Sequence, residues 1–99
     1  MHTFPAAPGY VVHTVIRVDD DYRYPMYPII AWRETEDGLV PLMLGAVWIE
    51  REGTALRQAI QTPGGTIADR NGFGFTDLDD FYKVACSELK PRPTLVAAE

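Results

Sequence analysis

β-Branched and aromatic residues dominate the first strongly patterned stretch of the chain, residues 10–18. Such side chains favour extended backbone, and because the two alternating sets differ in polarity, the pattern predicts a β-strand. The more apolar set is expected to face the core, with the other set on the opposite face. These sets are Tyr10, Val12, Thr14, Ile16 and Val18, and Val11, His13, Val15 and Arg17. The strand is expected to end at the acidic run 19–21.

A proline-containing stretch and a pair of strands follow. Residues 22–28 hold two prolines, which lack a backbone donor, and are expected to form a loop or a broken edge strand. Strands are predicted over 29–34 and 39–44, joined by a tight turn in the Asp-Gly pattern at 36–38. Pro41 places the second strand at an edge of the sheet or at a bulge.

The next segment contains two reversals. Residues 46–50 are predicted as a further short strand or a bent continuation of the previous one. Residues 54–62 fit both a helical face and strand alternation, and the Pro-Gly-Gly sequence at 63–65 favours the strand, paired in a hairpin with 66–69. A second turn is expected at 70–72.

The last element has the pattern of an amphipathic helix over residues 77–89. The Thr76 hydroxyl is expected to cap it, and the acids within 77–80 lie in the first turn, where the helix dipole favours negative charge. Prolines in 90–93 end the helix, and 94–99 should be a frayed tail. Its apolar stripe consists of Leu78, Phe81, Tyr82, Ala85 and Leu89.

The predicted elements are strands joined by tight reversals, followed by one helix at the end. This order predicts an α+β fold. We expect a curved antiparallel sheet of about four or five strands with the C-terminal helix packed on one face. A flexible segment 1–9 precedes the single domain 10–90, and a disordered tail 91–99 follows it. If no second layer covers the other face of the sheet, some of its large side chains are left partly exposed, among them Val11, Val15, Trp32 or Trp48.

Length and charge narrow the classes of function. The chain has 99 residues, 46% hydrophobic and 23% charged, which suits one domain with a modest core. Its formal net charge of −5 is the opposite of what a phosphate-backbone binder needs, so no nucleic acid partner is expected. No apolar run approaches the roughly 20 residues of a membrane span, and no signal peptide is apparent. The single Cys86 forms no intrachain disulfide, and a cytoplasmic protein is expected.

No motif fixes a reaction, a metal or a cofactor. His2 and His13 are not spaced as a metal-binding pair, and Cys86 is expected to pack as a small hydrophobe. The acidic runs 19–21 and 77–80 lack the spacing of a calcium loop and have structural explanations as a turn and a helix start. We therefore predict no catalytic residue, no metal ligand and no cofactor.

Aromatic residues supply the candidate binding surface. Tyr, Met and Trp are enriched at interface cores because they give a large contact area at a small entropic cost. Several lie within or near the proline-stiffened stretch 22–28, and they could equally cap an open end of the core. The predicted partner-binding residues are Tyr22, Tyr24, Met26, Tyr27 and Trp48.

Several segments together give the chain a resemblance to small uncharacterised proteins of actinobacteria and their bacteriophages. They are residues 28–32 before an acidic turn with Gly38, residues 39–42, the reversal at 62–65, and residues 75–81, which open the last helix. The resemblance implies a compact accessory protein, encoded by a phage and acting by binding a host protein, and it carries over no catalytic residue.

The prediction from these features is a small non-enzymatic protein-interaction module. It would dock a protein partner, or a second copy of itself, through the aromatic residues and an exposed edge strand. One alternative is a small-ligand-binding domain or minor enzyme with a pocket between sheet and helix, using Tyr82, His13 or Cys86. The second alternative is an acidic mimic of DNA that inhibits a host enzyme.

Overall fold

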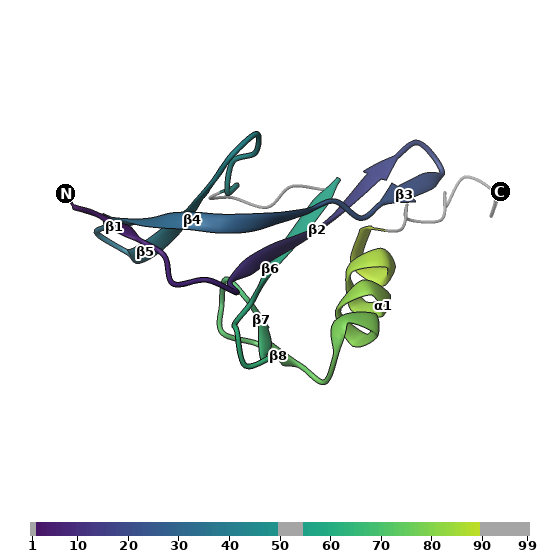
Figure 1. Cartoon of the computed structure of the whole chain (residues 1–99). Helices are drawn as coiled ribbons and strands as arrows, with labels where there is room; N and C mark the ends of the chain where they lie inside the picture. Colours follow the sequence, from purple (N-terminus) through teal and green to yellow (C-terminus); the bar gives the residue numbers. More distant parts are fainter. Residues whose placement is uncertain (1, 50–54, 90–99) are drawn as a thin grey trace, which may run out of the picture.

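The computed structural model describes residues 2–49 and 55–89. Over these ranges the chain forms an open antiparallel sheet of eight strands with one helix at its C-terminal end packed on it (Figure 1). The α+β class predicted from the sequence is confirmed. The elements are β1 (Thr3–Pro5), β2 (Val11–Val18), β3 (Asp21–Arg23), β4 (Met26–Thr35), β5 (Gly38–Met43), β6 (Leu56–Gln61), β7 (Ile67–Asp69), β8 (Gly74–Phe75) and α1 (Leu78–Leu89).

Strands β2 and β4 organise the sheet. Along one edge β2 pairs with β4 through residues 11–13 and with β3 through residues 16–18, and along the other it pairs with β6. Strand β4 runs on and pairs with β1 and with β5. Strands β7 and β8 extend the sheet beyond β6. The order is β1-β4-β2-β6-β7-β8, with β3 attached to β2 and β5 to β4.

The number of strands exceeds the four or five predicted. The additional strands β1, β3 and β8 have only two or three residues each, too few for an alternating pattern to show. Strand β1 lies in the segment 1–9 that was expected to be flexible, and there Phe4 pairs with Trp32 of β4. Residues 22–28 form the broken strand that their prolines indicated, since β3 ends at Arg23 and β4 begins at Met26.

Strand β2 is buried on both faces, whereas the sequence predicted that only the more apolar set faces the core. Val15 packs against Phe81 of α1, whereas Val12 packs in a separate cluster with Ile29 and Met43 on the opposite face. Both valines are 0% exposed. The more apolar alternating set therefore does not face the helix; a central strand covered on both sides has no polar face to reveal its orientation.

The second face of the sheet is covered by the chain that follows β5. Ala46 and Trp48 pack against the cluster of Val12, Ile29 and Met43, and Trp32 joins it from β4. Val15, considered above as an exposed residue, is fully buried on the helix side. The short strand considered for 46–50 is an isolated bridge between Ala46 and Met43, and residue 50 lies outside the described residues.

The predicted reversals are confirmed. Gly38, at a φ of 121°, leads from β4 into β5, a strand that within the described chain pairs only with β4, as its proline indicated. The β6–β7 hairpin closes through bonds between the main chains of Thr62, Gly65 and Thr66. In the β7–β8 turn the Asp69 carboxylate accepts the backbone N–H groups of Asn71 and Phe73.

Helix α1 matches the predicted helix, with a different cap. The Asp77 carboxylate accepts the backbone N–H of Asp80 at 2.8 Å, and the Asp80 carboxylate accepts that of Thr76 at 3.0 Å. Asp77 rather than Thr76 is thus the N-cap, because a carboxylate is the stronger acceptor for an orphan donor. The predicted helix stop at 90–93 and the tail lie outside the described residues. Within the described ranges, no helix has the length and apolar character needed to span a bilayer.

Candidate functional site

The two tyrosines that flank the end of β3 lie against one side of α1. The Tyr22 hydroxyl donates to the main-chain oxygen of Cys86 at 3.3 Å, and the Tyr24 hydroxyl lies 3.6 Å from the Cys86 Sγ. The Tyr24 and Tyr82 rings are 4.8 Å apart between centroids and tilted by 55°. These contacts fix the β3–β4 connection on the helix, although the two segments are far apart in the sequence.

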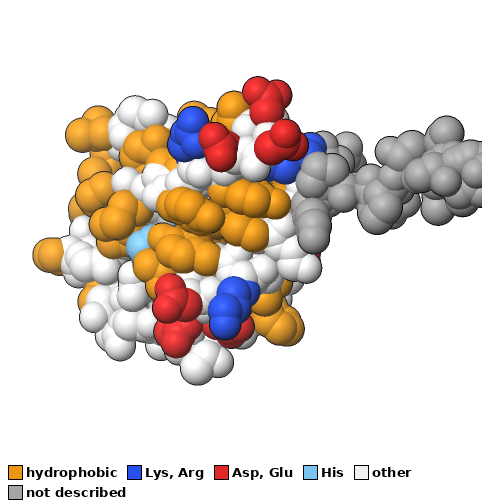
Figure 2. Space-filling view, turned by 90° about the vertical axis from the view of Figure 1, so that its right-hand side faces the viewer, with side chains coloured by type: hydrophobic (Ala, Val, Ile, Leu, Met, Phe, Trp, Pro, Cys, Tyr) orange, Lys and Arg blue, Asp and Glu red, His pale blue; other side chains and the backbone are white. Residues whose placement is uncertain are grey.

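Together with Met26 these side chains form a partly exposed surface, called the helix-side patch: Tyr22, Tyr24, Met26, Tyr82 and Cys86. Tyr24 is 48% exposed and Met26 is 59% exposed, while the other three are half-buried. Met26 pairs with His13 and is therefore on the same face of the sheet as α1. Figure 2 shows hydrophobic side chains gathered in the middle of this end of the molecule, where α1 and β3 meet.

Charged side chains surround the helix-side patch. Asp19 and Asp20 form the β2–β3 turn and Asp21 begins β3, all three exposed, and Asp79 precedes Tyr82 by one helical turn. Figure 2 shows acidic side chains above and below the hydrophobic area, with Lys and Arg side chains among them. Arg23 forms an exposed ion pair with Asp21 at 3.6 Å. The environment of the patch is therefore apolar at its centre and mainly acidic at its rim.

Two phenols of the patch have shifted ionisation. The hydrogen bond with the Cys86 thiol, with smaller effects of burial and neighbouring charge, raises the pKa of Tyr24 above its ordinary value near 10. Partial burial, followed by the negative charge of Asp79, raises the pKa of Tyr82. Both hydroxyl groups are therefore protonated at neutral pH and present a donor as well as an acceptor.

The structure brings together three of the five predicted partner-binding residues. Tyr22, Tyr24 and Met26 lie on the helix side of the sheet. Tyr27 pairs with Val12 and packs with Trp48 in the cluster on the opposite face. There the Trp48 ring also lies under the Arg70 guanidinium, 5.1 Å from its centroid. Tyr27 and Trp48 thus belong to a half-buried part of the core and not to the helix-side patch.

Tyr82 and Cys86 complete the patch, and the sequence assigned them to other roles. Tyr82 was part of the helix stripe and Cys86 a packed thiol, and both were candidates for a pocket. Their position at the margin of the stripe was the available signal, because residues there contact the core on one side and solvent on the other. Which segment lies beside that margin depends on the pairing of β3 with β2, which three residues of sequence do not reveal.

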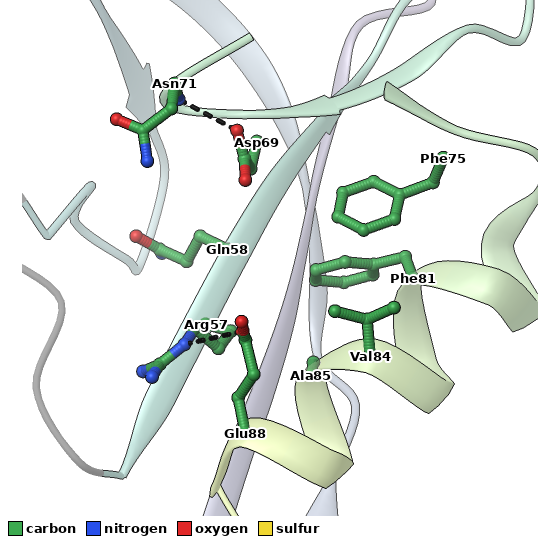
Figure 3. A pocket seen from close by; sticks show the side chains of 9 residues that line it. All are labelled: Arg57, Gln58, Asp69, Asn71, Phe75, Phe81, Val84, Ala85 and Glu88. Atoms are coloured by element: carbon green, nitrogen blue, oxygen red, sulfur yellow. Dashed lines mark hydrogen bonds and ion pairs between the residues drawn. The ribbon is translucent and has the colours of Figure 1, made fainter. Parts of the chain in front are cut away.

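A cavity of about 280 Å³ lies between α1 and strands β6 to β8 (Figure 3). Phe75 and Phe81 form its apolar wall, with ring centroids 5.2 Å apart. Arg57 and Glu88 form an ion pair at 3.1 Å across one end, and Asp69, fixed by the β7–β8 turn, lies at the other. The described residues that line it include no Ser, Thr, Cys, His or Lys, and its ionisable side chains are Arg57, Asp69 and Glu88.

The three residues considered for a pocket do not line this cavity. Tyr82 and Cys86 lie in the helix-side patch, and His13 is a buried residue of β2, 3% exposed. His13 Nε2 is 2.7 Å from the Gln61 side-chain oxygen. Within the described ranges, no group of three or more His, Cys, Asp or Glu side chains is arranged to hold a metal ion.

Comparisons with known proteins add no relationship: the chain matches no family model, no curated protein and no solved structure.

Proposed function

We propose that this protein is a small non-enzymatic interaction module that docks a protein partner through the helix-side patch. One observation carries the proposal: Tyr24 and Met26, two large side chains that are about half exposed, lie on a surface held in place by the hydrogen bonds to Cys86. A contiguous apolar surface on a small domain is typical of a binding site. Tyr and Met supply contact area, and the fixed Tyr24 ring loses little entropy on binding.

Strand β3 offers a second means of contact beside the patch. Within the described chain it pairs with β2 alone, so its outer edge is available for an added strand. Strand β5, which carries the predicted edge proline, pairs with β4 away from the patch. The edge that serves docking in this proposal is therefore that of β3.

The resemblance to small actinobacterial and bacteriophage proteins suggests the source of the partner. In this proposal the protein is phage-encoded, acts in the cytoplasm and binds a host protein. The test is recovery of host proteins from an actinobacterial lysate on immobilised wild type, on Tyr24→Ala/Met26→Ala and on Leu44→Ala/Val47→Ala.

The last variant is a matched control, because Leu44 and Val47 are 76% and 70% exposed and lie outside the patch. We expect a specific protein to be retained by wild type and by the control, and lost with the folded patch variant. Equal recovery by all three would remove the helix-side patch from the proposal.

A second candidate function, binding of a small ligand, is favoured only by the cavity between α1 and β6 to β8. Its polar lining and Phe75–Phe81 wall could hold a small partly apolar molecule. A fragment screen followed by amide chemical shifts tests it: shifts confined to Asp69, Phe75 and Val84 would support a ligand site. A screen in which no fragment shifts these amides at millimolar concentration would count against it.

A further inference from the structure

The rim of the helix-side patch has a negative balance of charge. Arg23 is paired with Asp21, so this pair contributes no net charge. The other charged residues beside the patch are three acids, Asp19, Asp20 and Asp79, and two cations, Lys83 and Arg17, which pairs with Tyr22, so the balance is negative by one charge. The acids lie on two opposite sides of the hydrophobic area, with Lys or Arg side chains beside them on each side (Figure 2). A partner that covers the patch must therefore pass between acidic groups.

This arrangement discriminates between possible partners. A second copy of the chain would bring the same acids together across a symmetric interface, and like charges in contact lower affinity. An acidic partner would meet the same repulsion. A partner with cations beside its apolar contact residues is attracted to the acidic rim. The rim acids lose little hydration, because they remain partly exposed to water in the complex.

We infer that the partner docks on the helix-side patch with a short apolar segment flanked by Lys or Arg, an inference that rests on the proposed function. The apolar side chains contact Tyr24 and Met26, and the flanking cations lie near Asp19 and Asp20 on one side and Asp79 on the other. The faces of Tyr24 and Tyr82 also favour a cation, because an aromatic ring is negative on its face. Met26 is unbranched and adapts to apolar side chains of different shape.

The test is selection of binders from a random-peptide display library on the immobilised full chain. Selected peptides are synthesised, and their affinities are measured by fluorescence anisotropy in low and in high salt. We expect selected sequences to place Lys or Arg next to aliphatic or aromatic residues. Raising the salt from about 0.05 M to about 0.5 M should weaken binding about threefold to tenfold, because a shorter Debye length screens the rim charges.

Matched variants separate the two parts of the site. Tyr24→Ala/Met26→Ala should weaken binding at least about tenfold, as loss of a central aromatic contact does. Asp19→Asn/Asp20→Asn should weaken it about threefold and reduce the salt dependence. Asn is suitable at position 19, where the backbone has a φ of 57°. The control Glu36→Gln/Asp37→Asn removes the same charge from the β4–β5 turn, away from α1, and should leave affinity unchanged.

Each outcome decides one proposal. Tyr24-dependent peptides without Lys or Arg, bound equally well in high salt, would overturn the inferred partner chemistry and leave the docking surface in place. Peptides that bind the patch variant as tightly as wild type would overturn the docking surface itself. Dimerisation that is lost in the patch variant, measured by sedimentation equilibrium, would make a second copy the occupant and overturn the inference.

Discussion

The hydroxyl group of Tyr24 and the Sγ of Cys86 lie 3.6 Å apart, although 62 positions separate the two residues in the sequence. This contact joins the connection between β3 and β4 to the exposed side of α1. Together with the contact between the Tyr24 and Tyr82 rings, it gives the proline-containing connection a fixed position. The partly exposed surface that we propose for docking is thus organised before any partner arrives.

Loss of the Cys86 thiol should change the ionisation of Tyr24. Because the hydrogen bond with this thiol is the largest cause of the raised pKa, Cys86→Ala should lower the pKa of Tyr24 toward its ordinary value. The measurement is the ultraviolet absorbance of tyrosinate during an alkaline titration, with Tyr24→Phe as the control that identifies the Tyr24 transition. An unchanged transition in Cys86→Ala would show that the contact does not form in solution.

Burial of Tyr82 should make the fold less stable at alkaline pH. A folded-state pKa above the unfolded value means that folding favours the protonated phenol, so the stabilisation is complete below the unfolded pKa. The free energy of unfolding should then fall as the pH rises from about 10 through the raised pKa. Urea unfolding at a series of pH values measures this fall, and Tyr82→Phe should reduce it. A Tyr82→Phe variant with the wild-type slope would contradict the prediction.

The helix cap offers a comparison between adjacent residues. The Asp77 carboxylate accepts the Asp80 N–H, so Asp77→Ala should lower the free energy of unfolding by about 1 kcal/mol. Thr76→Ala should have a much smaller effect, because it is the main-chain N–H of Thr76 that is bonded, to the Asp80 carboxylate. Urea denaturation of both variants measures the difference. A larger loss of stability for Thr76→Ala than for Asp77→Ala would indicate that Thr76 is the N-cap, as the sequence suggested.

Local patterns predicted the elements that depend on neighbouring residues. The Asp-Gly, Pro-Gly-Gly and Asn-Gly turns and the amphipathic helix were predicted because each is determined by a few adjacent side chains. The more apolar set of β2 faces a core cluster through Val12, as predicted, but the pattern did not show that Val15 of the other set is buried too, beneath α1. The short strands β1, β3 and β8 depend on distant partners and leave no alternating pattern of their own.

The helix-side patch likewise combines residues that the local sequence indicated with residues that only the tertiary structure brings together. Tyr22, Tyr24 and Met26 could be named from their composition and spacing. That Tyr27 lies on the other face follows from its pairing with Val12, a register that local sequence does not specify. The contribution of Tyr82 and Cys86 depends on how α1 crosses the sheet, which is decided by the packing of Phe81 against Val15 and Ile67.

Phe81 should be essential for the packing of α1 on the sheet. Its side chain is 2% exposed and contacts the Phe75 and Tyr82 rings, with centroids 5.2 and 5.8 Å away. Phe81→Ala should cost about 3–5 kcal/mol, a large part of the stability of a domain of this size. Phe73→Ala is the matched control, because Phe73 is 62% exposed and meets the Phe75 ring edge-on, with centroids 5.4 Å apart. Similar urea midpoints for the two variants would contradict this account of the core.

Gln58 should hold the chain after β5 on the second face of the sheet. Its side-chain oxygen accepts the Ile49 N–H at 2.9 Å, and its nitrogen donates to the Val47 carbonyl at 3.4 Å, in a site where Gln58 is 3% exposed. Gln58→Leu keeps the approximate volume but leaves these main-chain groups without this partner, at a cost of about 1–3 kcal/mol.

Amide hydrogen exchange by NMR distinguishes a local effect of this substitution from a global one. In Gln58→Leu the Ile49 amide should exchange faster than in wild type under conditions in which the protein remains folded. The amides of α1 serve as the internal control and should change only by the global loss of stability, because α1 packs on the opposite face from Ile49. Equal protection of the Ile49 amide in both proteins would show that the segment is held by its apolar contacts, through Trp48 and Ala46, rather than by Gln58.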